Sequence, residues 1–313
     1  MEDQTVERIN PDRVRYIKLG HHGAWEKECL EKGIVRIGFG SADPRKFEAC
    51  QSGRWNDIRD LYVAAGKDKT TATRFSNELR LFFEDDGSTL WITFVGERLC
   101  WGMVGDADPK PHADGSGVWR PIRDGWSWKD LRGEPLTKDR LSGALTKLAA
   151  YRGTSCDVDV SDYVIRRVNG KKTPEVEQAL RASKAMKKSA GALMKLLGPR
   201  DFELLVDLVF TTSGWRRVGV VGKTQKTLDL DLVLPSTDER AFVQVKSKTD
   251  SYELATYVAK FEDGDWDRMF FVFHSGEPKA VVDDPRVTLI GPEKLAELVV
   301  TAGLVGWLIQ KVS

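Results

Sequence analysis

The chain has 313 residues and a net charge of +1, with 30% charged and 41% hydrophobic residues. This balance excludes a disordered or collagen-like chain, and the length suggests two globular domains. No apolar run approaches the ~20 residues of a membrane span, so a membrane protein is also excluded. The near-neutral charge gives no general support for nucleic-acid binding, although local basic patches decide that property.

The N-terminal residues and the cysteines indicate the cellular compartment. Residues 1–13 are polar and acidic and contain no signal-peptide core. The four cysteines form no CxxC pair, which favours reduced thiols over a zinc site or a disulfide framework. We therefore expect a cytoplasmic protein.

The first half of the chain mixes short strands with helices. We expect strands at 13–19, 34–39, 89–95, 98–104 and 118–122. We expect helices at 23–32, 44–51, 55–65, 70–84 and 137–151. These elements predict an α+β domain over residues 1–168, built on a small, curved, mostly antiparallel sheet.

Seven of the ten tryptophans lie in this half. Most are expected in the core, but one or two are candidates to stack on a flipped, modified base. The candidates for that role are Trp91, Trp101 and Trp119. The mixture of curved strands and short helices weakly resembles the PUA-like and EVE-type base readers, which implies that this domain recognises DNA or a modified base.

A basic helix is expected between the two halves. Thr173 is a plausible N-cap before Pro174, and Gly198–Pro199 would end the helix, so residues 169–198 are predicted to connect the domains. Its lysines Lys184, Lys187 and Lys188 allow two interpretations. They form either a solvated face or a surface that follows a phosphate backbone.

The second half predicts a three-layer α/β domain at 199–313 with a mixed sheet and flanking helices. The expected strands are 215–221, two strands within 228–246, 269–273 and 287–290, and the expected helices are 200–212, 251–261 and 292–302. The stretch 228–246, LDLDLVLPSTDERAFVQVK, has the alternation of a hairpin. Because strand residues alternate between faces, Asp231, Gln244 and Lys246 are expected to converge on one face. An acid, an amide oxygen and an ammonium together suit a hard divalent cation beside a phosphate.

The order of these polar residues resembles a known family. Glu203 in the helix DFELLVDLVF precedes Asp231, and QVK follows at 244–246. Over residues 199–300 this arrangement is similar to the PD-(D/E)xK superfamily, and most of all to Mrr-like restriction endonucleases, which have QxK in place of ExK. The family has a more glycine-rich run before the aspartate, so Asp229 and Asp231 compete as the metal ligand. Asp231 is preferred because LVL follows it directly, as in the family.

The resemblance implies a Mg²⁺-dependent DNA endonuclease with the restriction-endonuclease-like fold, and Mn²⁺ as a substitute metal. Asp231, Gln244 and the Val245 carbonyl would hold the metal, Lys246 would orient or activate a water, and Glu203 would complete the acidic shell. Since Gln244 replaces an acid, we expect weak metal binding and a requirement for millimolar magnesium.

The expected partner is double-stranded DNA, possibly with modified bases, and a homodimer is expected when both strands are cut. Phosphate contacts are expected from Arg216, Arg217, Lys223, Lys226 and Lys248. The biological role expected is restriction of foreign DNA. A repair or junction nuclease, and a non-catalytic DNA-binding protein with a vestigial nuclease fold, are the alternatives.

Overall fold

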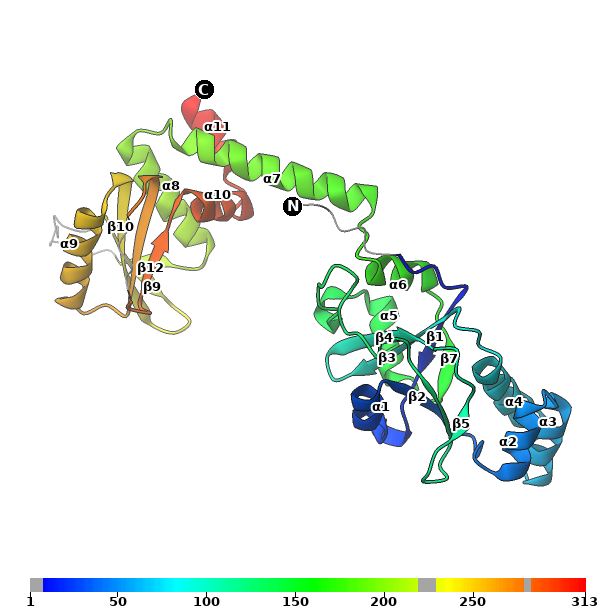
Figure 1. The fold of residues 1–313 in the computed structure, drawn as a ribbon. Coiled ribbons are helices and arrows are strands. Elements are labelled where there is room, and N and C mark those ends of the chain that lie inside the picture. Colours follow the sequence, from blue (N-terminus) through cyan, green and yellow to red (C-terminus); the bar gives the residue numbers. More distant parts are fainter. Residues whose placement is uncertain (1–7, 219–228, 279–282) are drawn as a thin grey trace. The chain divides into compact units, whose positions relative to one another are not determined.

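The computed structural model describes residues 8–218, 229–278 and 283–313. The chain is an α/β protein. It divides into two compact units, residues 1–173 and 174–313 (Figure 1). In the described part of the chain no single helix is long and apolar enough to cross a membrane. The helices α10 (Pro292–Thr301) and α11 (Val305–Val312) meet that test only as a pair bent by 110°.

The N-terminal unit contains two small sheets, whereas the sequence predicts one. The first has the order β4-β3-β1-β7, in which β1 and β3 are parallel and the other pairs antiparallel. Its strands are β1 (Arg13–Ile17), β3 (Thr89–Val95), β4 (Arg98–Met103) and β7 (Ser155–Asp157). The second sheet is antiparallel and consists of β2 (Ile34–Ile37), β6 (Val118–Pro121) and β5 (Lys110–Pro111).

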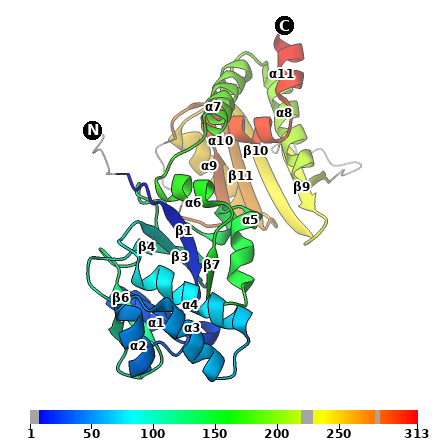
Figure 2. The ribbon, with the colours of Figure 1, turned by 90° about the vertical axis from the view of Figure 1, so that its right-hand side faces the viewer.

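The helices of this unit range from 4 to 15 residues and lie at several places around the sheets (Figure 2). They are α1 (Glu26–Lys32), α2 (Pro44–Gln51), α3 (Trp55–Ala64), α4 (Lys69–Phe83), α5 (Gly143–Thr146) and α6 (Ser161–Val168). Asp43 and Asp68 cap α2 and α4 by accepting backbone N–H groups, as their positions before these helices predict. The single helix predicted at 137–151 is wrong, because this segment breaks into two 3₁₀ turns and α5.

The C-terminal unit is built on a five-stranded mixed sheet in the order β12-β11-β10-β9-β8. Strand β10 pairs antiparallel with β9 and parallel with β11. The strands are β8 (Arg216–Arg217), β9 (Leu230–Leu234), β10 (Glu239–Thr249), β11 (Arg268–Gly276) and β12 (Val287–Ile290). The predicted strand at 215–221 is described only to residue 218, and β8 covers two of its residues.

Two apolar cores place helices on both faces of this sheet. On one face α7 (Pro174–Met194), α8 (Pro199–Thr212), α10 (Pro292–Thr301) and α11 (Val305–Val312) pack over residues such as Val243 and Val245. On the other face α9 (Ser251–Glu262) packs over Phe242 and Phe271. This arrangement is the three-layer architecture that the strand and helix order predicts.

Helix α7 belongs to the C-terminal unit and is not a free connector. Its residues Ala190 and Met194 are fully buried in the core beneath α10, and Lys187 pairs with Glu297 of α10 at 2.8 Å. The predicted segment 169–198 is therefore divided: the chain separates after Thr173, and the helix that follows packs as part of the second unit.

Candidate active site

The Asp229 carboxylate, the Gln244 amide and the Val245 backbone meet just before the first residue of β9. Asp229 directly precedes β9, and its Oδ2 accepts hydrogen bonds from the Gln244 side-chain amide and, at 2.7 Å, from the backbone N–H of Val245. Gln244 is only 3% exposed. A carboxylate and a buried amide are thus held against each other at the point where β9 begins.

The strand register brings these residues together. Phe242 lies opposite Asp231 and Val243 opposite Leu230, so the next position of β10, Gln244, faces Asp229. Strand β9 begins at Leu230, and the Asp229 side chain just before it accepts the backbone N–H of Val245.

Asp231 has a different role from the one expected. Its carboxylate binds Arg240 at 3.0 Å and the indole N–H of Trp266 at 3.3 Å. It shares a face with Asp229 but lies two residue pairs further along the strands, opposite Phe242. The expected convergence of Asp231 with Gln244 is not found, because it is Asp229 that contacts Gln244, and this contact favours Asp229 as the metal ligand.

Lys246 follows on the same face of β10 and interacts with α9. Its Nζ lies 3.9 Å from Glu253 and 5.0 Å from the centre of the Tyr257 ring. Burial lowers the pKa of Lys246, but Tyr257 and the charges of Glu253 and Asp229 raise it by more, and the net shift is upward. Lys246 is therefore a cation at neutral pH. Sequence reasoning missed Glu253 and Tyr257, although their spacing of four places both on one side of α9.

Glu203 approaches this group from α8. Burial raises the pKa of its carboxyl, and the negative charge of Asp229 raises it further, while Arg200, Arg217 and Lys246 oppose the shift. The effect of Asp229 on the Glu203 pKa indicates that these two carboxylates lie within electrostatic range of each other. The structure thus joins Asp229 directly to Gln244, while Glu203 is linked to Asp229 and Lys246 only by the effect of their charges on its pKa.

The donor set fits a hard divalent cation. Gln244 Oε1 is buried and has no hydrogen-bond partner among the described residues. It lies on the side chain bound to Asp229, and Glu203 supplies a second carboxylate nearby. Magnesium commonly binds one or two carboxylates together with waters and substrate phosphates. Within the described ranges no cluster of three or more His, Cys, Asp or Glu residues forms a metal site. The adjacent histidines His21 and His22 therefore belong to no such cluster.

The predicted phosphate-binding residues fall into three groups. Arg216, Arg217 and Lys248 are exposed on β8 and β10, and Arg217 also donates to the backbone carbonyl of Asp229 at 3.1 Å. On α7, Lys184 and Lys188 are exposed, whereas Lys187 is bound to Glu297. Lys223 and Lys226 lie outside the described residues.

The three tryptophans chosen for base stacking are not free aromatic surfaces. Trp91 is fully buried and its indole N–H donates to Asp85 at 2.7 Å, so its assignment to base reading is wrong. Trp101 is half-buried against the core and donates to the Lys129 carbonyl at 2.7 Å. Trp119 also packs against a core as a half-buried side chain.

A different tryptophan of the N-terminal unit lines a pocket. Trp25 borders a pocket of about 140 Å³ together with Lys18, His21 and Arg152. The guanidinium of buried Arg36 lies over the Trp25 ring at 4.3 Å and fixes its position. Gly20 and Gly38 also line this pocket, and these two glycines on either side of Trp25 are the feature of the sequence that could have indicated it.

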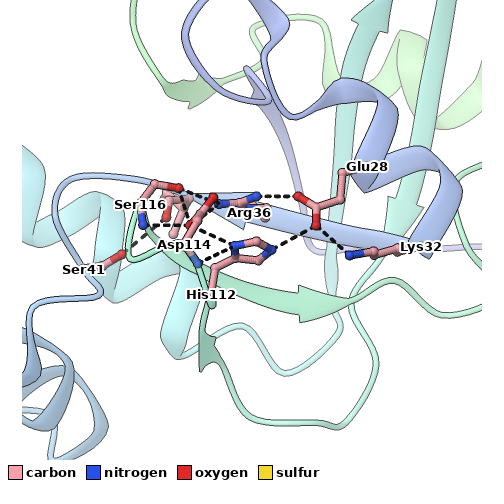
Figure 3. Close-up of polar contacts among 8 residues, drawn as sticks. Glu28, Lys32, Arg36, Ser41, His112, Asp114 and Ser116 are labelled. Atoms are coloured by element: carbon pink, nitrogen blue, oxygen red, sulfur yellow. Dashed lines mark hydrogen bonds and ion pairs between the residues drawn. The ribbon is translucent and has the colours of Figure 1, made fainter.

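Arg36 also anchors a polar network beside Trp25 (Figure 3). It binds Glu28 of α1 at 2.5 Å and Asp114 of the 112–116 loop at 2.8 Å, while the His112 ring lies between the same two carboxylates. Hydrogen bonds from Lys32, His112 and Arg36 lower the pKa of Glu28 to about 2. Because the charges are balanced within the network, we interpret it as a structural connection of α1, β2 and the loop.

Comparisons with protein-family models, with curated proteins and with solved structures find no significant match to this chain.

Proposed function

We propose that this protein is a magnesium-dependent DNA endonuclease whose active site consists of Asp229, Gln244, Lys246 and Glu203. The observation that supports the proposal is the contact of Asp229 with Gln244, whose buried Oε1 has no partner in the described part of the chain. A purely structural hairpin gains nothing from an unsatisfied buried carbonyl, which costs about 1–3 kcal/mol.

Asp229, Glu203 and Gln244 Oε1 are the groups that would hold the metal. A bound magnesium ion would lower the pKa of a water molecule and neutralise charge on the phosphate. Lys246, a cation at neutral pH, is suited to bind a non-bridging phosphate oxygen and to stabilise the negative charge of the transition state. Glu253 and Tyr257 position its ammonium group.

Glu203 is suited to proton transfer. A carboxylate whose pKa is raised accepts a proton more readily than an ordinary one, and Glu203 has such a raised pKa beside Asp229. In this proposal Glu203 takes the proton of the attacking water, while Asp229, which accepts hydrogen bonds from Val245 and Gln244, is a ligand of the metal.

The N-terminal unit selects the DNA in this proposal. The pocket lined by Trp25, His21 and Arg152 supports a role in base reading, because it combines an aromatic ring with hydrogen-bond donors. The biological role proposed is restriction of foreign DNA, including DNA with modified bases, in the cytoplasm. A homodimer would supply the two active sites needed to cut both strands.

Digestion of plasmid DNA tests this proposal. The purified chain is incubated with unmodified, methylated and hydroxymethylated plasmids, with magnesium, with manganese or with EDTA. We expect metal-dependent cutting, with a preference for a modified plasmid if the role is restriction. Equal cutting of all plasmids would favour a repair or junction nuclease. Binding without cutting under every metal condition would leave only the non-catalytic alternative.

A further inference from the structure

Five basic side chains of the N-terminal unit face one pocket of about 630 Å³. The basic pocket, as we name it, is lined by Arg132, Arg140, Arg167, Lys171 and Lys172. Two acids, Asp130 and Glu134, also line it. All these residues lie between positions 130 and 172 and belong to the N-terminal unit.

The backbone holds the walls of the basic pocket together. The N–H of Leu131 donates to the Val168 carbonyl at 2.8 Å and joins the 130–135 loop to the end of α6. Gly170 has a φ of +62°, and a Cβ there would come within 2.9 Å of the Arg132 side chain. The arginine stem therefore lies close against the glycine backbone, and a side chain at position 170 would displace it.

The acids of the basic pocket are already engaged. Asp130 accepts the backbone N–H groups of Arg132 and Glu134, both at 2.9 Å, and Glu134 pairs with Arg140 at 3.5 Å. Within the described residues, the side chains of Arg132, Arg167, Lys171 and Lys172 have no ion pair, and Arg167 Nε is buried without a hydrogen-bond partner. In a chain with 48 basic and 47 acidic residues, four unpaired cations around one pocket are a local excess of positive charge.

Such an excess fits a polyanion. Like charges held together repel one another, and an anion that bridges them removes this cost. Arginine binds phosphate with paired N–H groups and lysine binds it as a point charge. The pocket is larger than one phosphate group needs, and successive phosphates of a DNA strand lie about 3.4 Å apart along the helix axis.

We infer that the basic pocket binds consecutive phosphates of a DNA backbone and so gives the N-terminal unit its own contact with the duplex. This inference rests on the proposed function for the identity of the nucleic acid. It adds phosphate-binding residues in the N-terminal unit, whereas the contacts expected from the sequence lie on α7 and in the C-terminal unit.

The test is the binding of the full chain to a short labelled duplex by fluorescence anisotropy, in EDTA so that no cutting occurs, over a series of salt concentrations. The variant is Lys171→Glu/Lys172→Glu. The matched control, Lys27→Glu/Lys67→Glu, makes the same charge change at two exposed lysines on other parts of the same unit. Thermal unfolding of each variant verifies that it is folded.

We expect the variant to bind at least about tenfold more weakly. The steepness of its plot of log K against log salt should decrease by about 2, because each lost phosphate contact reduces the magnitude of the slope by about 1. The control should bind within about twofold of the wild type. A variant that binds with the affinity and slope of the control overturns the inference.

Further arms separate this inference from the proposed function. A wild-type chain that binds through the basic pocket but never cuts with magnesium supports the inference and removes the proposed activity. A wild-type chain that cuts, with a variant that binds like the control, removes only the inference. If inorganic phosphate, but no duplex, stabilises the wild type and not the variant against heat, the pocket takes free phosphate and the inference fails.

Discussion

Gln244 has one side-chain atom satisfied and one left without a partner. Its amide nitrogen donates to Asp229, and its Oε1 is buried without a hydrogen bond from any described residue. A neutral amide can be buried beside a carboxylate at little cost, whereas a second acid there would repel Asp229 in the absence of a cation. The residue type at position 244 therefore sets how strongly the site depends on a metal.

Gln244→Glu tests this dependence. In metal-free buffer the new carboxylate beside Asp229 should lower the Tm by roughly 5–10 °C, which corresponds to a cost of ~2–3 kcal/mol. Magnesium or manganese should restore most of the loss and should affect the wild type much less. Differential scanning calorimetry with and without metal measures both effects. A variant whose Tm is equally low with and without metal would show that no cation binds between residues 229 and 244.

The choice between Asp229 and Asp231 shows why part of the site could not be predicted. Both aspartates lie on one face because strand residues alternate, and that face was predicted correctly. A shift of two residues in the pairing keeps every side chain on its face, so the pattern cannot set the register. The turn at 235–238 sets it, because it pairs Glu239 with Leu234 and Val243 with Leu230, so that the Gln244 side chain reaches Asp229.

At the scale of elements, long helices with regular apolar spacing were the most predictable. Helix α4 buries Ala72, Leu79 and Phe82, as the spacing of its apolar residues indicates. The 137–151 segment lacked such a signal, and Ser142–Gly143 interrupts it, so it forms short turns. Helix α7 was predicted as a helix, but its many lysines favoured an exposed connector, and the packing of Ala190 and Met194 into a core was not predicted.

The network of α1, β2 and the 112–116 loop should make the N-terminal unit sensitive to acid. Since the pKa of Glu28 is lowered to about 2 in the folded state, its stabilising effect is complete above its ordinary value of 4.5 and is lost as the pH falls towards 2. Glu28→Gln should therefore lose less stability than the wild type between neutral pH and about pH 3. Thermal unfolding of the N-terminal unit across this range measures the difference.

The control for this prediction is Glu31→Gln, an exposed acid on the same helix. It should follow the wild-type pH dependence, because its only ion pair with a described residue is a solvated one with Lys27. A Glu28→Gln variant with an acid sensitivity equal to that of the wild type would contradict the network's role.

At the scale of the whole molecule, the sequence predicts two folding units and their class because the patterns of apolar residues differ between helices and strands. Each unit has cores of its own, and the separation after Thr173 lies close to the expected boundary at 168. The two sheets of the N-terminal unit were not predictable, since the short strands β5 and β7 carry too few residues for an alternation. Its pocket beside Trp25 likewise depends on residues that are far apart in the sequence, Lys18 and Arg152 among them.

The central claim is that Asp229 and Gln244 form a magnesium-dependent cutting site, and a paired comparison tests it most directly. Asp229→Ala and Asp231→Ala are assayed for cleavage of the plasmid that the wild type cuts, in saturating magnesium. Loss of the metal-binding carboxylate should reduce the rate by about 10³ or more for Asp229→Ala. Asp231→Ala, which removes only the partner of Arg240 and Trp266, should stay within about tenfold of the wild type. An active Asp229→Ala enzyme beside an inactive Asp231→Ala enzyme would contradict the account.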